Sequence, residues 1–180
     1  QGTSDSNEVW IQVDVQLDGK TIAGSGRIAP SGEVDRWSHF LNSFVLDREG
    51  KKIHRRNVED IFVPLYNHQI PPGAADTLHY MLHVPEDASG ELTVTVKALY
   101  RKFDQQFMKI VGGPSVNDLP ITVLGEDQVT FAIGSGDGRH ASESAPLWKR
   151  WNDYGIGLLR KGGSGAVRGE LVSASHAFEQ

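Results

Sequence analysis

The sequence predicts a mainly β protein, an antiparallel β-sandwich of immunoglobulin-like or related topology followed by a short C-terminal α-helical hairpin. In several stretches apolar and polar residues alternate, which is the period-two pattern of half-buried strands. The 20 glycines and 8 prolines are scattered between these stretches, as expected for the turns of an all-β chain. From residue 147 onward the apolar spacing changes to that of a helix.

The N-terminal part is expected to form a flexible arm followed by a hairpin. Residues 1–8 are polar, and residues 9–17 alternate regularly between apolar and polar side chains. Asp18-Gly19 is a strong signal for a two-residue turn, so residues 21–29 are expected to return as the partner strand. Two glycines in that partner predict a bulge or an edge position.

About seven strands are expected in total. The alternation predicts further strands at residues 40–46, 78–84, 92–100, 121–124 and 128–133. It is clearest at residues 78–84 and 92–100. The interval 105–111 fits either a strand or a helix, and the pattern at residues 57–60 predicts one helical turn.

The domain limits follow from a change in composition. Residues 134–146 are rich in glycine and serine, the composition of a linker. We therefore expect a β-sandwich domain over residues 9–133, a linker over residues 134–146 and a helical repeat fragment over residues 147–180.

Composition excludes several classes of function. The 18 basic and 23 acidic residues give a net charge of −5, which argues against nucleic acid or an anionic membrane as a partner. The chain has no cysteine, so it forms no disulfide and holds no covalently attached haem. It has no apolar run long enough to span a membrane. The first residue is glutamine, from which we expect a processed or excised chain, and the sequence leaves open whether an export signal was lost.

The motifs of catalysis are also missing, so the sequence predicts that the chain is not an enzyme. It contains no G-x-S-x-G nucleophile elbow. Its adjacent carboxylates flank predicted turns, where neighbouring side chains point apart. Asp137 and His140 lie close together in sequence, but in the predicted linker, where a catalytic group lacks rigid support.

Histidines and tryptophans are the remaining candidates for binding. His68 lies just before Pro71-Pro72, which fixes the chain, and a neutral imidazole is a good metal ligand. Trp10 and Trp37 are candidate platforms for a glycan or a peptide, because aromatic rings outside a core often bind ligands or cover an interface.

Two stretches carry a family resemblance. They are Trp37-Ser38-His39-Phe40 continuing through residues 55–75, with Arg-Asn before Pro-Pro-Gly, and residues 148–159. Together they resemble the middle region of large exported multihaem c-type cytochromes that also carry tetratricopeptide repeats. The resemblance covers most of residues 8–180.

The helical end supports the repeat. Trp151, Gly155, Leu158 and Gly162 match the first helix of a tetratricopeptide repeat, and Ala174 and Phe178 match the second. The gap between the two helices is about seven residues too long, so an insertion is assumed. Because one repeat cannot bury its own face, we expect a fragment of a longer protein or a partner chain. The expected partner interface consists of Trp148, Trp151, Tyr154, Leu158 and Phe178.

The resemblance implies a function. It points to a non-catalytic scaffold or interaction module of a periplasmic or extracellular electron-transfer protein, with a haem-bearing domain or subunit and further helical repeats as partners. Histidines outside the haem-binding motif can complete the axial ligation of a haem held elsewhere, and the candidates are His68, His39 and His79. The alternative hypothesis is a glycan- or peptide-binding sandwich module that uses Trp10 and Trp37. The third hypothesis is an enzyme.

Overall fold

A computed structural model describes residues 7–54, 57–135, 138–140, 145–163 and 168–180. These residues form mainly antiparallel sheet with a few helices, as expected for a mainly β chain. They belong to two compact units, one comprising residues Gln1–Gln69 and Pro85–Ala141 and the other Ile70–Val84 and Ser142–Gln180. The sandwich topology, the tetratricopeptide character and the predicted domain limits stay predictions. Most of the predicted arm lies outside the described residues.

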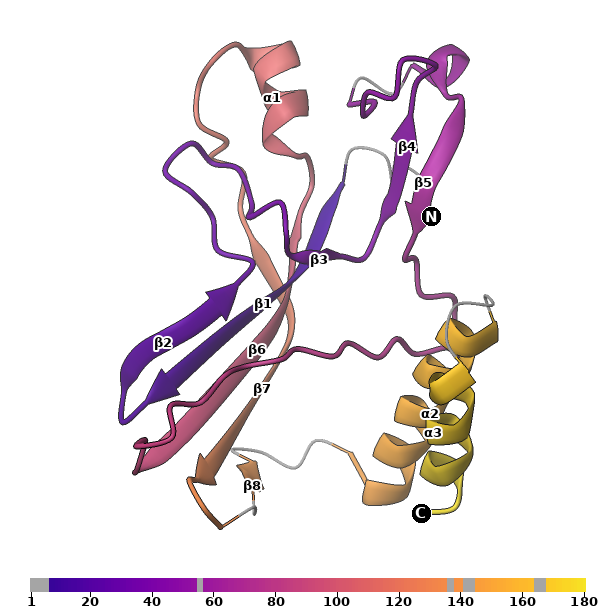
Figure 1. Cartoon of the computed structure of the whole chain (residues 1–180). Coiled ribbons are helices and arrows are strands. Elements are labelled where there is room, and N and C mark those ends of the chain that lie inside the picture. The colour runs from indigo at the N-terminus through magenta and orange to yellow at the C-terminus, as the bar shows by residue number, and fades with distance from the viewer. Residues whose placement is uncertain (1–6, 55–56, 136–137, 141–144, 164–167) are drawn as a thin grey trace. The chain divides into compact units, whose positions relative to one another are not determined.

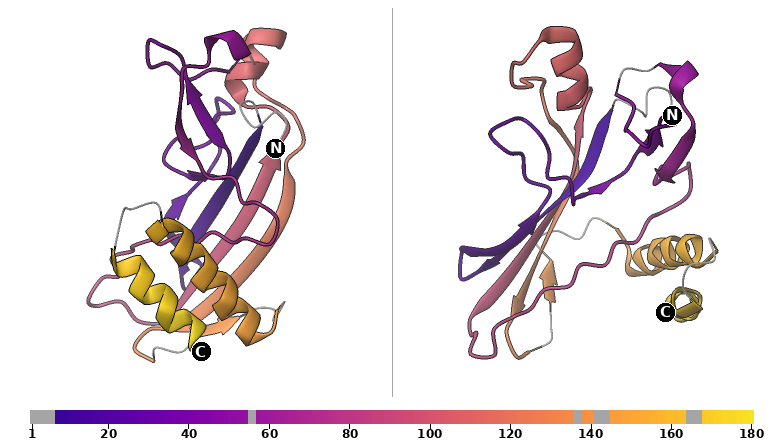
Figure 2. Two further views of the ribbon diagram at one scale, coloured as in Figure 1. Left: turned by 90° about the vertical axis from the view of Figure 1, so that its right-hand side faces the viewer. Right: turned by 45° about the horizontal axis from the view of Figure 1, so that its top comes forward.

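The first unit is built on a six-stranded antiparallel sheet (Figure 1). Its strand order is β2-β1-β6-β7-β8, and β3 pairs with β1. The strands are β1 Glu8–Leu17, β2 Lys20–Ser25, β3 His39–Phe40, β6 Glu91–Arg101, β7 Thr122–Ala132 and β8 Gly138–His140. The long strands β1, β6 and β7 lie side by side in every view (Figure 2).

A smaller sheet and a helix complete this unit. Strands β4 Ser43–Leu46 and β5 Val63–Asn67 pair with each other, and the 3₁₀ turn η1, Val58–Asp60, lies between them in sequence. The helical turn predicted near residues 57–60 is thus confirmed. The ambiguous interval 105–111 is helix α1, Gln105–Gly112. The Asp104 side chain caps this helix by accepting a hydrogen bond from the Phe107 N–H.

The predicted first hairpin is confirmed. Asp18 and Gly19 have φ values of 46° and 78°, the left-handed conformation that a type I′ turn requires at both positions. Strand β2 lies at the edge of the sheet. Its register with β1 shifts between Val15 and Gln16 and passes over Ile22, so the bulge and the edge position are both present.

The core of the sheet lies on the face of β1 that carries Trp10. Trp10 is fully buried with Val34 and Leu99, and Phe40 packs against this cluster. The indole Nε1 donates a hydrogen bond to the Gly26 carbonyl at 2.9 Å. The expectation that Trp10 is an exposed platform is therefore wrong. Alternation located the strand correctly, but it does not say which face is covered.

The predicted strands agree with the structure to different degrees. Residues 92–100 lie within β6, and residues 9–17 lie within β1. Residues 40–46 are divided between β3 and β4, and the two strands predicted at residues 121–133 are one continuous strand, β7. The predicted linker contains β8, whose Arg139 forms an ion pair with Glu91.

The second unit consists of two helices and an extended segment. Helices α2, Leu147–Gly163, and α3, Arg168–Phe178, lie side by side (Figure 2). Residues 78–84 are in no sheet, so the strand predicted there is wrong. The segment that contains them is held by α2 instead. The Thr77 hydroxyl donates a hydrogen bond to the Tyr154 carbonyl at 3.1 Å, and Arg160 donates one to the Ala75 carbonyl at 2.7 Å.

Candidate functional site

Two of the three predicted haem-ligand histidines meet in a stack of rings. The His39 and His68 rings stack with their centroids 4.6 Å apart, and Tyr66 stacks on His68 with a centroid distance of 4.3 Å. Phe44 extends the row, 5.2 Å from Tyr66. We call these four residues the ring stack. It arises because β4 pairs with β5, which places Phe44 opposite Tyr66.

The ring of His68 is held in one tautomer. Its Nδ1 lies 3.2 Å from the Phe40 carbonyl oxygen. Because a carbonyl oxygen only accepts, Nδ1 is the donor, and in the neutral form of the ring Nε2 is the atom whose lone pair can ligate a metal. The neighbouring rings of His39 and Tyr66 fix the orientation of the imidazole. The arrangement gives His68 the form that an axial ligand needs.

His79 belongs to the second unit, whereas the ring stack belongs to the first. Its Nε2 is 3.4 Å from the Tyr154 hydroxyl, and its Nδ1 is 3.7 Å from a Glu170 carboxylate oxygen. Both ring nitrogens therefore have a polar neighbour, so His79 is a weaker ligand candidate than His68.

Nothing among the described residues holds a metal ion unaided. Where side chains are described, no group of three or more His, Cys, Asp or Glu residues has the arrangement that a metal requires. A haem or metal contacted by His68 would therefore have to bring most of its own ligands.

Most residues of the expected partner interface are exposed or half-buried. Trp148 is 67% exposed, and Tyr154 and Phe178 are also exposed. Trp151 is half-buried with its ring 6.0 Å from Tyr154. Leu158 is fully buried, so its expected place in a partner interface is wrong.

Trp37 is 80% exposed, with the Arg36 guanidinium 4.9 Å from its ring centroid. Its predicted role as a platform stays a prediction.

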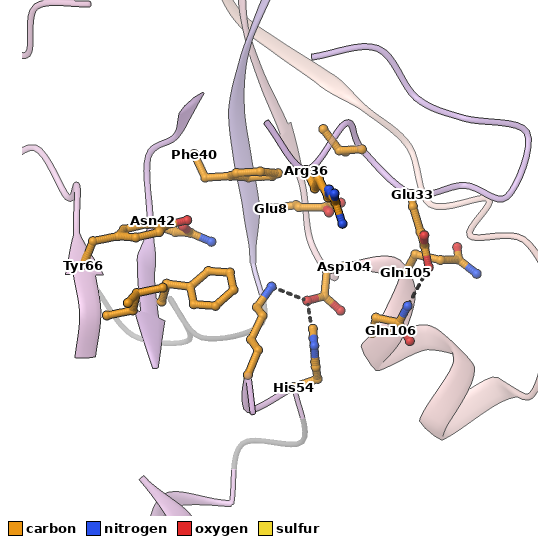
Figure 3. A pocket seen from close by; sticks show the side chains of 14 residues that line it. Glu8, Glu33, Arg36, Phe40, Asn42, His54, Tyr66, Asp104, Gln105 and Gln106 are labelled. Atoms are coloured by element: carbon orange, nitrogen blue, oxygen red, sulfur yellow. Dashed lines mark hydrogen bonds and ion pairs between the residues drawn. The ribbon is translucent and has the colours of Figure 1, made fainter. Parts of the chain in front are cut away.

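A pocket that the sequence did not reveal lies in the first unit (Figure 3). It has a volume of about 380 Å³. At its base His54 Nδ1 and Lys52 Nζ lie 2.8 and 3.2 Å from the same oxygen of Asp104. Lys52 and His54 are about 50 positions from Asp104 in sequence, so no local spacing indicates the cluster. The only feature of the sequence that could have suggested this cluster is that the chain contains several histidines.

Two carboxylates of the pocket, those of Glu8 and Asp104, have opposite pKa shifts. Burial raises the pKa of Asp104, but the hydrogen bond from His54, the charge of Lys52 and the Phe107 N–H outweigh it, so that the pKa lies below its ordinary value. Burial raises the pKa of Glu8 above its ordinary value, although the buried Arg101 opposes the shift. Arg101 Nε donates to Glu8 at 3.0 Å.

The His54–Asp104 pair has the geometry of a base with its orienting acid. The described residues that line the pocket include no serine, threonine or cysteine, and the hydroxyl group of this lining is the phenol of Tyr66.

No protein-family model, no curated protein and no solved structure matches this chain. Among the helices that the structure describes, none has the length and hydrophobicity needed to cross a lipid bilayer.

Proposed function

We propose that the chain is a non-catalytic scaffold and interaction module of a multihaem electron-transfer protein, in which His68 supplies a distal ligand to a haem held by another domain or subunit. The observation that carries the proposal is the state of His68. Its Nδ1–H is bound to the Phe40 carbonyl and its ring is stacked on both sides, which leaves Nε2 as the ligating atom. The haem itself is part of the proposal because the sequence resembles that of multihaem cytochromes.

The proposal includes a repeat hairpin in the second unit. Gly155 of α2 lies against Phe178 of α3, and a Cβ at Gly155 would come within 2.6 Å of the Phe178 ring. Two positions of the repeat pattern thus meet where the helices approach each other. The exposed Trp148 and Phe178 give further repeats an apolar surface to cover. The sandwich topology and a periplasmic or extracellular location belong to the same proposal.

A haem titration tests the proposed function. The probe is a haem peptide that carries one axial histidine and has the opposite axial position open. We expect the wild-type chain to convert its Soret band to that of a low-spin, bis-histidine haem, and the His68→Ala variant to leave the band unchanged.

The matched control is His83→Ala, because His83 is exposed and lies outside the ring stack. This variant is expected to behave as the wild type. An unchanged spectrum with the wild-type chain, or an equal response from His68→Ala, would contradict the proposal.

A further inference from the structure

We infer that the pocket of the first unit binds a small organic anion, a single carboxylate attached to an apolar or aromatic group. The pocket volume of about 380 Å³ lies at the lower end of the roughly 300–1,000 Å³ found for ligand pockets, which suits a ligand with one ring or two. The inference does not depend on the haem proposal, because the cation that it uses, Arg36, lies outside the ring stack.

The first step is a cation without a counter-ion. Arg36 lines the pocket on the same side as Phe40, away from His54 (Figure 3). The residue is exposed, so a ligand can reach it. The guanidinium carbon lies 4.9 Å from the centroid of the Trp37 ring, and Arg36 forms no ion pair within the described part of the chain. A cation–π contact leaves the charge in place and the N–H groups able to bind a carboxylate.

The second step concerns the other charges of the pocket. Each of the three carboxylates that line it already has a basic partner: Glu8 pairs with Arg101, Asp104 with Lys52, and Glu33 with Lys109. These pairs cancel in charge, so with His54 neutral the described lining residues and their partners leave one positive charge, that of Arg36. A ligand with a single negative charge completes the balance, whereas a cation would be repelled. A dianion would carry one charge without a partner.

The third step concerns the walls. Apolar and aromatic side chains supply much of the lining, namely Val34, Phe40, Phe44, Leu65 and Tyr66. Such walls hold an apolar or aromatic group by removing it from water and by edge-to-face or offset packing against the rings. A sugar acid would bring several hydroxyl groups that these walls leave unpaired. The free guanidinium and the apolar walls together therefore define the ligand as a carboxylate with an apolar group.

The experiment measures binding of five probes to the full chain at neutral pH by ligand-observed NMR and calorimetry. The probes are phenylacetate, phenethyl alcohol, phenethylammonium, acetate and phenyl phosphate. We expect phenylacetate to bind and the other four to bind at least about tenfold more weakly, because each lacks either the single negative charge or the apolar group. Equal or tighter binding of any of these four, or no binding of phenylacetate at millimolar concentration, would overturn the proposal.

Arg36→Gln is the decisive variant, because it removes the charge and keeps most of the side-chain length. Phenylacetate binding is expected to weaken about tenfold, and phenethyl alcohol binding is expected to stay unchanged, because the alcohol has no charge for Arg36 to bind. Since Arg36 is exposed, the melting temperature is expected to stay level. Unchanged phenylacetate binding, or an equal loss for the acid and the alcohol, would refute the proposal.

The matched control is Arg48→Gln. Arg48 is also exposed, and its guanidinium carbon also lies 4.9 Å from the centroid of an aromatic ring, that of Phe62. It does not line this pocket, so the variant is expected to bind phenylacetate as the wild type does. An equal loss of binding in the Arg36 and Arg48 variants would mean that the acid binds to exposed arginines in general.

A second pair of variants tests the apolar walls. Leu65→Ala removes a wall side chain that is 60% exposed, and Leu124→Ala removes a leucine of similar exposure, 58%, from β7. Phenylacetate binding is expected to weaken about fivefold in the first and to stay unchanged in the second. Equal effects of the two substitutions would contradict binding in this pocket.

Discussion

Asp104 joins two separate segments through one carboxylate. One oxygen accepts the Phe107 N–H at the start of α1, and the other contacts Lys52 and His54. The side chain is 5% exposed. A buried carboxylate of this kind is stable only while all of its partners are present, so Asp104 connects the α1 end of the unit to the segment before η1.

Asp104→Asn is expected to destabilise the first unit by about 1–3 kcal/mol at pH 7, because the charge that pairs with Lys52 and His54 is lost and the helix cap weakens. The midpoint of urea unfolding measures the change. Asp118→Asn is the control, because Asp118 is exposed, and it is expected to change the midpoint little. Equal stability of the wild type and Asp104→Asn would contradict the role assigned to this carboxylate.

The same residue predicts a pH dependence. Since the pKa of Asp104 is lowered from 3.8 in the folded state, the unfolded chain binds the proton more readily. Its contribution to the free energy of unfolding is therefore complete above the unfolded pKa and is lost as the pH falls below about 4. The difference in stability between wild type and Asp104→Asn is expected to shrink in this acid range.

Gly26 is required for the burial of Trp10. It has a φ of +79°, and a Cβ there would lie 2.8 Å from the Gln12 Cα. Gly26→Ala is expected to destabilise the unit by about 2 kcal/mol or more, from backbone strain and from the clash. Gly50→Ala has the same strain at φ +77° but no atom within 4 Å, so its cost is expected to be about 1 kcal/mol. Thermal unfolding measures the loss of stability in both variants. Equal losses of stability would mean that the structure shifts to avoid the clash at Gly26.

At the residue scale, the sequence shows which side chains have the chemistry to bind a ligand, but it does not show which other residues they contact. His68 and His39 were chosen as histidines that could bind haem, but their contact depends on the pairing of β4 with β5 and of β3 with β1. Alternation shows that Trp10 lies on the face of β1 opposite Val9 and Ile11, but it does not show that this face is covered by Val34 and Leu99. Asn42, His54 and Asp104 come from distant segments, and no periodicity connects them.

At the scale of elements, alternation and turn residues predicted a strand correctly where that segment pairs with another strand of the chain. The Asp18-Gly19 turn and strands β1 and β6 were predictable from alternation and turn residues. Residues 78–84 have the same alternation but belong to a segment that contacts helix α2, through Ala75, Thr77 and His79. Since alternation measures only the two faces of an extended chain, it cannot distinguish a sheet partner from a helical one.

The helical pair is expected not to fold alone. A peptide of residues 147–180 contains helices of 17 and 11 residues, which are marginal by themselves in water, and it lacks the segment Ile70–Val84. We expect little helical circular dichroism from this peptide and a gain when a peptide of residues 70–84 is added. A scrambled 70–84 peptide is the control, and a stable helical spectrum of 147–180 alone would contradict the expectation.

At the scale of the whole molecule, the two units are interleaved in sequence. The chain leaves the first unit after Gln69, returns to it at Pro85 and leaves it again after Ala141. The last of these changes falls within residues 134–146, the stretch whose composition is that of a linker. The earlier pair has no such signature, because an extended segment bound by helices has the same composition as a strand.

This interleaving sets an order of events during synthesis. Thr77 and Tyr154, which share a hydrogen bond, are 77 residues apart. A ribosome that adds roughly 5–20 residues per second needs about 4–15 seconds to cover that distance. Throughout this interval the nascent segment Ile70–Val84 lacks the helices that hold it, so chaperones at the ribosome encounter it as an unpaired apolar stretch.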